Sequence, residues 1–159
     1  MKKVSLLLCI LMLVLGLIGC SSAPGIESQP PAEPSITEDP WGIALSVKDV
    51  TPTGCTLVCT QSGGSPSGEL MTGTPYWLQV WKDGQWKAVE ETPSEYERAW
   101  TSEAWLITME GTTEWEVNWE WLYGPLPAGT YRISKAIMDF RGTGDYDERV
   151  YYAQFEIPG

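Results

Sequence analysis

The chain has 159 residues, which is enough for one domain of ordinary size. It carries 21 acidic against 10 basic residues, a formal net charge of -11, which disfavours binding to the phosphate backbone of nucleic acids. It contains no histidine, which excludes Ser-His-Asp and Cys-His catalysis and every imidazole general base.

The first twenty residues have the pattern of a bacterial export signal. Two lysines precede an apolar run from Val4 to Ile18, which is short for a membrane span and typical of a signal peptide over residues 1–19. The sequence Leu-Ile-Gly-Cys then resembles a lipobox, which implies that Cys20 becomes the first mature residue and carries acyl chains such as palmitate. We therefore expect a lipoprotein anchored to the outer face of the bacterial cell membrane. The alternative is an ordinary cleaved signal that contains a cysteine.

Residues 20–40 are predicted to form a tether between this anchor and the folded domain, which covers residues 41–159. The tether is rich in proline and acidic residues and carries few large aliphatic side chains, so it lacks the apolar area that ordering requires. In an extended polyproline conformation, about twenty residues reach ~60 Å. Removal of residues 1–19 removes two lysines and no acid, so the mature protein is even more acidic and is expected to stand away from anionic lipid.

The rest of the chain has the periodicity of β-strands. Apolar and polar residues alternate in short stretches separated by turn residues, and only residues 93–104 allow a short helical turn. Strands without helices between them predict an all-β fold, an antiparallel β-sandwich of seven to eight strands. The predicted strands cover residues 43–48, 55–60, 105–109, 114–121, 130–140 and 149–157, with a hairpin over residues 76–89.

A tyrosine follows a Pro/Gly corner in the sequence Leu-Pro-Ala-Gly-Thr-Tyr of residues 126–131. Immunoglobulin-like domains place a tyrosine at such a corner so that its hydroxyl bonds to upstream backbone. We expect this role for Tyr131. The alternative is a simple turn followed by a core tyrosine.

Several segments together resemble one family. The resemblance is to bacterial Ig-like domains of Firmicutes-type surface lipoproteins, and it spans nearly all of residues 42–158. It implies an immunoglobulin-like β-sandwich, alone behind a lipobox or appended to membrane sensor-peptidase proteins, without established enzymatic activity or cofactor. The segments are residues 51–54, 60–64, 76–78, 83–86, 119–124, 126–133 and 152–157.

Two cysteines, Cys55 and Cys59, fall within the predicted domain. Four residues along one strand separate Cα atoms by ~13 Å, whereas a disulfide needs about 5.5 Å. We expect two free thiols on the core face; a local bridge would require the strand to break.

Some carboxylates are candidates for catalysis or metal binding. Glu114, Glu116 and Glu120 share a predicted strand face with Asn118, on which neighbours two apart lie ~6.6 Å from each other, but a solvated polar face is favoured because no sequence feature supplies a cleft. In the acidic stretch 139–148, Asp145 and Asp147 are weak calcium candidates, and a flexible hairpin connection is favoured. We predict no catalytic residues and no metal site.

Six of the nine tryptophans fall into two groups of three. Trp115, Trp119 and Trp121 share a predicted strand face with Val117, so they are expected in the core. The second group lies in the hairpin, where Asp-Gly at residues 83–84 is typical of a type I′ turn.

That turn places Trp81 opposite Trp86 and puts Trp77 on the same face. The opposite face is the better core face, because it carries Tyr76, Leu78, Val80 and Val89. We therefore expect an exposed aromatic strip as the binding surface for a protein or glycan. A one-residue bulge would reverse the two faces.

The sequence thus predicts a non-catalytic extracytoplasmic lipoprotein whose Ig-like module contacts a protein or glycan at the cell surface and does not bind nucleic acid. One alternative is a carbohydrate-binding module that uses the tryptophans of the hairpin. The other is a surface hydrolase, with Glu116 or Asp145 as its carboxylate.

Overall fold

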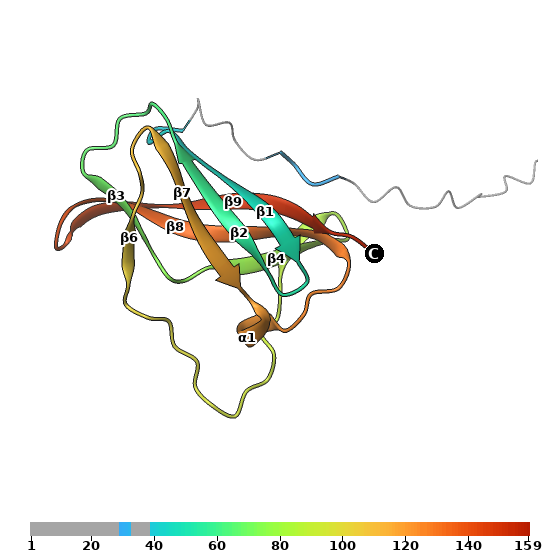
Figure 1. The fold of residues 1–159 in the computed structure, drawn as a ribbon. Coiled ribbons are helices and arrows are strands. Elements are labelled where there is room, and N and C mark those ends of the chain that lie inside the picture. Colours follow the sequence, from blue (N-terminus) through green and yellow to red (C-terminus); the bar gives the residue numbers. More distant parts are fainter. Residues whose placement is uncertain (1–28, 33–38) are drawn as a thin grey trace, which may run out of the picture.

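Two antiparallel sheets lie face to face in the structure, a computed structural model that describes residues 29–32 and 39–159 (Figure 1). The predicted all-β sandwich is confirmed, although the described residues form nine strands rather than seven to eight. Three of them belong to one sheet and six to the other.

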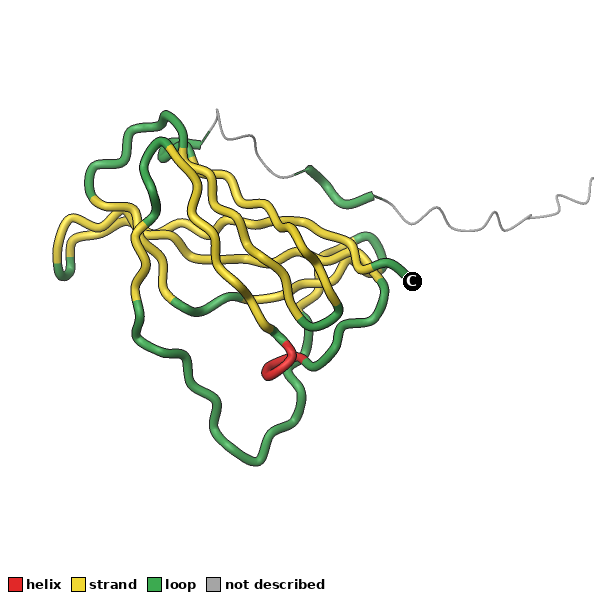
Figure 2. The backbone as a smooth tube through the Cα atoms, viewed as in Figure 1, coloured by secondary structure: helices red, strands yellow, loops and turns green. Residues whose placement is uncertain are grey.

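The elements follow the alternation of apolar and polar residues, as expected for half-buried strands. They are β1 (Ile43–Thr51), β2 (Gly54–Gln61), β3 (Glu69–Gly73), β4 (Trp77–Lys82), β5 (Gln85–Ala88), β6 (Ala104–Leu106), β7 (Gly111–Asn118), α1 (Glu120–Tyr123), β8 (Gly129–Gly142) and β9 (Asp145–Ile157). One sheet has the order β1-β2-β7, and the other has the order β5-β4-β8-β3-β6. Strand β9 pairs with the edge of β8 opposite to β4 and β3. Figure 2 shows the long loop that connects β5 to β6 and the single turn of helix that follows β7.

Aromatic rings join the two sheets in the core. Trp119 is fully buried and stacks on Phe155 at 5.4 Å between ring centroids, and its Nε1 donates to the Pro52 carbonyl at 2.8 Å. Phe155 in turn stacks on Tyr131 at 5.7 Å. The Tyr131 hydroxyl donates to the Pro127 carbonyl at 2.9 Å, so the predicted tyrosine corner is confirmed.

Cys55 and Cys59 are both free and buried, as predicted from their spacing on one strand. Both side chains point from β2 into the core, because residues two and four apart share a strand face. Desolvation raises the pKa of each thiol to about 12, so both remain protonated and unreactive at neutral pH.

The predicted strand over residues 114–121 is wrong at its end. Strand β7 stops at Asn118, whose side-chain Oδ1 accepts the Glu120 amide at 2.9 Å, and the chain turns into α1. Trp121 therefore leaves the strand face and is 43% exposed, with its ring edge-to-face on Trp100 at 5.1 Å. Residues 93–104, where a helical turn was allowed, contain no helix.

The acidic stretch 139–148 is also not the flexible connection that was expected. Strands β8 and β9 extend through it and leave only a tight turn at residues 143–144. Asp139 is buried and accepts hydrogen bonds from Ser67 and Gly68. Although desolvation opposes it, these bonds and the nearby Arg141 hold the pKa of Asp139 below its ordinary value. Asp139 thereby fixes the loop before β3 to β8. Strand β3 itself was not among the predicted strands.

A buried lysine fills the place where β8 changes partner from β4 to β3. Lys135 is 2% exposed, and its ammonium donates to the carbonyls of Gly73 and Pro75 at 2.6 and 3.3 Å. It lies 5.3 and 5.7 Å from the ring centroids of Trp105 and Trp115. These contacts satisfy carbonyls that the interrupted strand pairing leaves unpaired.

We expect the stability of the protein to rise with pH because of Lys135. Desolvation lowers its pKa from 10.5 to about 8, so between these values the unfolded state binds a proton that the folded state does not. The free energy of unfolding should increase by roughly 3 kcal/mol over this range, relative to Lys135→Met. Urea denaturation of both proteins at pH 7.5 and pH 10 measures the difference. An equal pH dependence in both proteins would contradict the burial of a titrating lysine.

Candidate functional site

The β4–β5 hairpin closes as its turn sequence predicts. Asp83 and Gly84 have φ angles of 55° and 73°, the left-handed values that a type I′ turn requires at both positions. Lys82 pairs with Gln85, and Trp81 pairs with Trp86. The predicted two-residue loop and register are confirmed.

This register separates the two faces of the hairpin. Tyr76 and Leu78 are buried in the core, and Val80 and Val89 pack against it. The alternate residues, which we call the tryptophan strip (Trp77, Trp81 and Trp86), lie outside both core clusters. No bulge reverses the faces, so the sequence predicted the direction of all three rings.

The tryptophan strip is less open than expected. Trp77 is 49% exposed, but Trp81 and Trp86 are half-buried and pack edge-to-face at 5.1 Å. The Arg132 guanidinium covers part of Trp86, since its Cζ lies 4.6 Å from the Trp86 ring centroid. The strip is therefore a packed aromatic surface with one open end.

Arg132 extends this surface across the sheet. It lies on β8 between Gln79 of β4 and Gln154 of β9, and its Nε donates to the Gln79 Oε1 at 2.6 Å. Its guanidinium also lies 4.1 Å from the Tyr152 ring centroid. Sequence reasoning missed Arg132 and Tyr152, because the pairing of β4 with β8 joins segments about fifty residues apart and has no local sequence signal.

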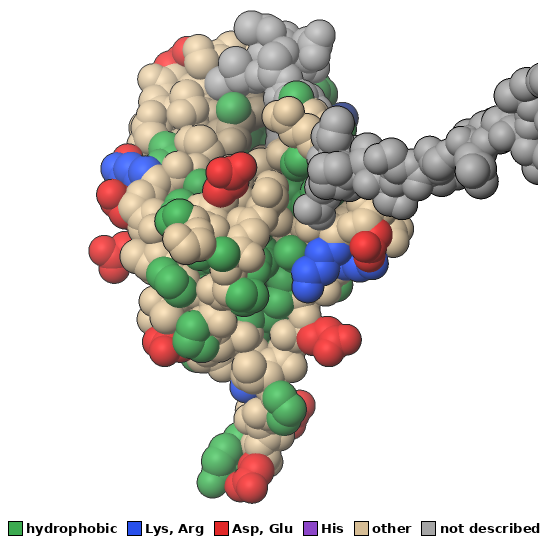
Figure 3. Space-filling view, turned by 90° about the vertical axis from the view of Figure 1, so that its right-hand side faces the viewer, with side chains coloured by type: hydrophobic (Ala, Val, Ile, Leu, Met, Phe, Trp, Pro, Cys, Tyr) green, Lys and Arg blue, Asp and Glu red, His purple; other side chains and the backbone are tan. Residues whose placement is uncertain are grey.

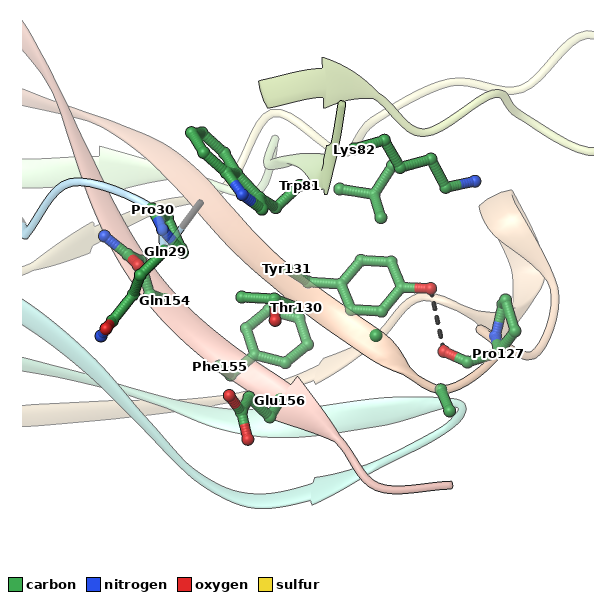
Figure 4. Close-up of a pocket in the computed structure, with 13 residues that line it drawn as sticks. Gln29, Pro30, Trp81, Lys82, Pro127, Thr130, Tyr131, Gln154, Phe155 and Glu156 are labelled. Carbon is green, nitrogen blue, oxygen red and sulfur yellow. Dashed lines mark hydrogen bonds between the residues drawn. The ribbon is translucent and has the colours of Figure 1, made fainter. Parts of the chain in front are cut away.

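A groove of about 640 Å³ opens beside Trp81. One wall comes from Trp81, Thr130 and Gln154 on the solvent-facing side of the six-stranded sheet, which we call the outer face. The other comes from Gln29 and Pro30, in the segment predicted as a tether (Figure 4). On the face of the molecule that Figure 3 shows, hydrophobic side chains gather near the middle, and acidic and basic side chains lie around them.

The candidate catalytic carboxylates do not assemble. Glu114 is paired with Lys48 at 2.8 Å, Glu116 is exposed on β7, and Glu120 belongs to α1 rather than to the predicted row. Asp145 lies in the other sheet and pairs with Arg141 at 2.9 Å. The predicted row is therefore broken: Glu114 and Glu116 remain on the exposed face of β7, whereas Glu120 and Asp145 lie in other elements.

The weak calcium candidates are held by a cation. Arg141 pairs with Asp145 at 2.9 Å and with Asp147 at 3.0 Å. Within residues 29–32 and 39–159, no group of three or more His, Cys, Asp or Glu side chains is placed to hold a metal ion. The geometry at this hairpin is that of an ion-pair cluster.

Comparison with known families agrees with this architecture. The model of a bacterial Ig-like domain matches residues 39–156, which is most of the chain. The chain belongs to the bacterial Ig-like domain family. Domains of this family are typically extracellular and non-catalytic. Neither the curated proteins nor the solved structures that were compared gave a match to this Ig-like chain.

The predicted lipid anchor of this Ig-like protein lies outside the described residues, as do the signal peptide and most of the tether. In the part of the chain that the structure describes, no helix has the length and apolar character needed to cross a bilayer.

Two tryptophans provide a matched test of the core and the strip. Trp86 Nε1 is buried without a hydrogen-bond partner among the described residues, whereas Trp119 Nε1 donates to Pro52. Trp86→Phe removes an unsatisfied donor, so it should change the free energy of unfolding by less than about 1 kcal/mol. Trp119→Phe removes the hydrogen bond to Pro52 and opens a cavity in the core, and should cost about 2–4 kcal/mol. Chemical denaturation measures both, and equal losses would contradict this division.

Proposed function

We propose that this Ig-like domain is an interaction module on the outer face of the bacterial cell membrane. In this proposal, a lipid on Cys20 anchors the chain, and the outer face of the six-stranded sheet binds a protein or glycan partner. The observation that carries the proposal is the separation of the two hairpin faces. The aliphatic face completes the core, and three tryptophans are left on the solvent side.

The composition of this surface supports a binding role. Tryptophan, tyrosine and arginine are the residue types that contribute most to binding energy at protein interfaces. The outer face combines them, since Arg132 is stacked between Trp86 and Tyr152. A side chain ordered in this way loses less conformational entropy when a partner binds.

The outer face also carries positive charge, in contrast to the net negative charge of the protein. The protein is strongly acidic, yet Arg132 lies at the centre of the outer face, and Arg149 lies close by over the Trp41 ring. Both arginines line a second, smaller groove of about 330 Å³ with Tyr151 and Tyr152. A partner that offers acceptor groups and apolar area would complement this surface.

The anchor is supported by the lipobox resemblance and by the extracellular character of the family. Replacement of Cys20 by serine should abolish acylation, because serine lacks the thiol that carries the lipid. Membrane fractionation of cells that express the full chain should then show loss of the mature, lipid-anchored form. Unchanged fractionation and unchanged mass of the mature protein would contradict anchoring through Cys20.

A carbohydrate-binding module is the second candidate, and one feature favours it. Trp77 is half-exposed at the open end of the tryptophan strip, beside the polar Ser134 and Gln79. Sugar rings stack on indoles and accept hydrogen bonds from neighbouring polar side chains. The same residues would serve a protein partner, so the test has to separate the two.

The test uses two exposed tryptophans in different places. Trp77→Ala should weaken binding at least about tenfold, because it removes the most accessible ring of the strip. Trp121→Ala is the matched control, since Trp121 is similarly exposed but belongs to α1. Glycan-array binding and photo-crosslinking from positions 77 and 121 in intact cells measure the two partner classes. Equal behaviour of both variants in both assays would contradict the proposed surface.

A further inference from the structure

The outer face already carries a piece of this chain. Residues 29–32 of the tether lie against it, separated in sequence by more than a hundred residues from the strand that they contact. The Gln154 side-chain amide on β9 donates to the Pro31 carbonyl at 2.6 Å. Because this hydrogen bond is made to a backbone carbonyl, it does not depend on the identity of the side chains in the bound segment.

Pro30 faces the groove at the same place. Pro30 and Gln29 line the groove beside Trp81, with Gln154 as a neighbour (Figure 4). Aromatic side chains that line a groove, together with a polar side chain that binds backbone, are the general means by which proteins bind extended proline-rich peptides. Such peptides lose little entropy on binding, because proline restricts them beforehand.

A second contact fixes the chain close to this place. The Tyr151 hydroxyl donates to Asp39 at 2.9 Å, and the same carboxylate accepts the amides of Trp41 and Ile43. Asp39 and Pro31 are thus both bound to β9, by Tyr151 and Gln154. Charge also favours the contact, because residues 21–40 contain acids and no Lys or Arg, whereas Arg132 of β8 and Arg149 of β9 line one groove.

We propose that the outer face is a binding site for an extended, proline-containing peptide, and that tether residues Gln29–Pro31 are its resident occupant. A partner peptide binds by displacing them. This inference rests on the proposed function for its external partner, while the contact with the tether stands independently. Docking of Gln29–Pro31 would also shorten the distance that the domain can reach from the membrane. In an extended polyproline conformation, residues 21–28 would span ~25 Å from Cys20, against ~60 Å for the whole tether.

The test observes Trp81 in the full chain, labelled with 5-fluorotryptophan and held in detergent. Loss of one fluorine resonance in Trp81→Phe assigns its signal. Replacement of both Pro30 and Pro31 by glycine should shift that signal, because it removes the rings and raises the entropic cost of docking. Replacement of Ala23 and Pro24 by glycine is the matched control, since it loosens the tether outside the docked segment, and should leave the signal unchanged.

A synthetic peptide with the sequence Ser-Gln-Pro-Pro-Ala-Glu then tests binding from solution. It should return the Trp81 signal of the Pro30/Pro31 variant towards its position in the parent, and a peptide with glycine at both prolines should not. The parent should bind the peptide about tenfold more weakly than the variant, as expected when the tether occupies the site nine-tenths of the time. An unshifted Trp81 signal in the variant, or no binding of the peptide, would overturn the inference.

The experiments distinguish a failure of this inference from a failure of the proposed function. Glycan binding that depends on Trp77, without peptide binding, overturns the inference and leaves the proposed function standing. Peptide binding without any effect of Trp77→Ala on cell-surface partners supports the tether site and contradicts the proposed use of the strip.

Discussion

Strand β8 is the element on which the rest of the structure depends. Its 14 residues pair with β9 along one edge, and with β4 and then β3 along the other. Because strand side chains alternate, this pairing decides both surfaces of the sheet at once. Tyr131 and Ile133 enter the core, and Arg132 between them faces outward, where it joins Trp86 of the β4–β5 hairpin to Tyr152 of β9.

The same strand carries two buried charged groups, and each marks a place where irregular chain meets the sheet. Lys135 binds the carbonyls between β3 and β4, and Asp139 binds the amides before β3. A buried charge is tolerated only when hydrogen bonds replace its hydration. These two residues therefore hold β3, which the sequence alone did not predict, against β8. The position of β3 in turn sets the width of the outer face.

The binding surface follows from this arrangement. The core is filled by the aliphatic side of the hairpin, so the tryptophan strip remains on the solvent side of a sheet whose strands come from three separate regions of the chain. The tether returns to this surface through Gln154 and the groove beside Trp81. Taken together, the two proposals link the lipid anchor, the tether and the outer face, because a ligand of this face would compete with the segment that holds the domain to the membrane.

The sequence by itself determined the features that depend on neighbouring residues. The register of the hairpin follows from Asp83 and Gly84, the tyrosine corner from the turn before Tyr131, and the free thiols from the period of one strand. Only the tertiary structure decided that β7 ends at Asn118 and that Arg132 lies among the aromatic rings. These features depend on which distant strands pair and on hydrogen bonds between remote segments, for which a strand carries no local signal.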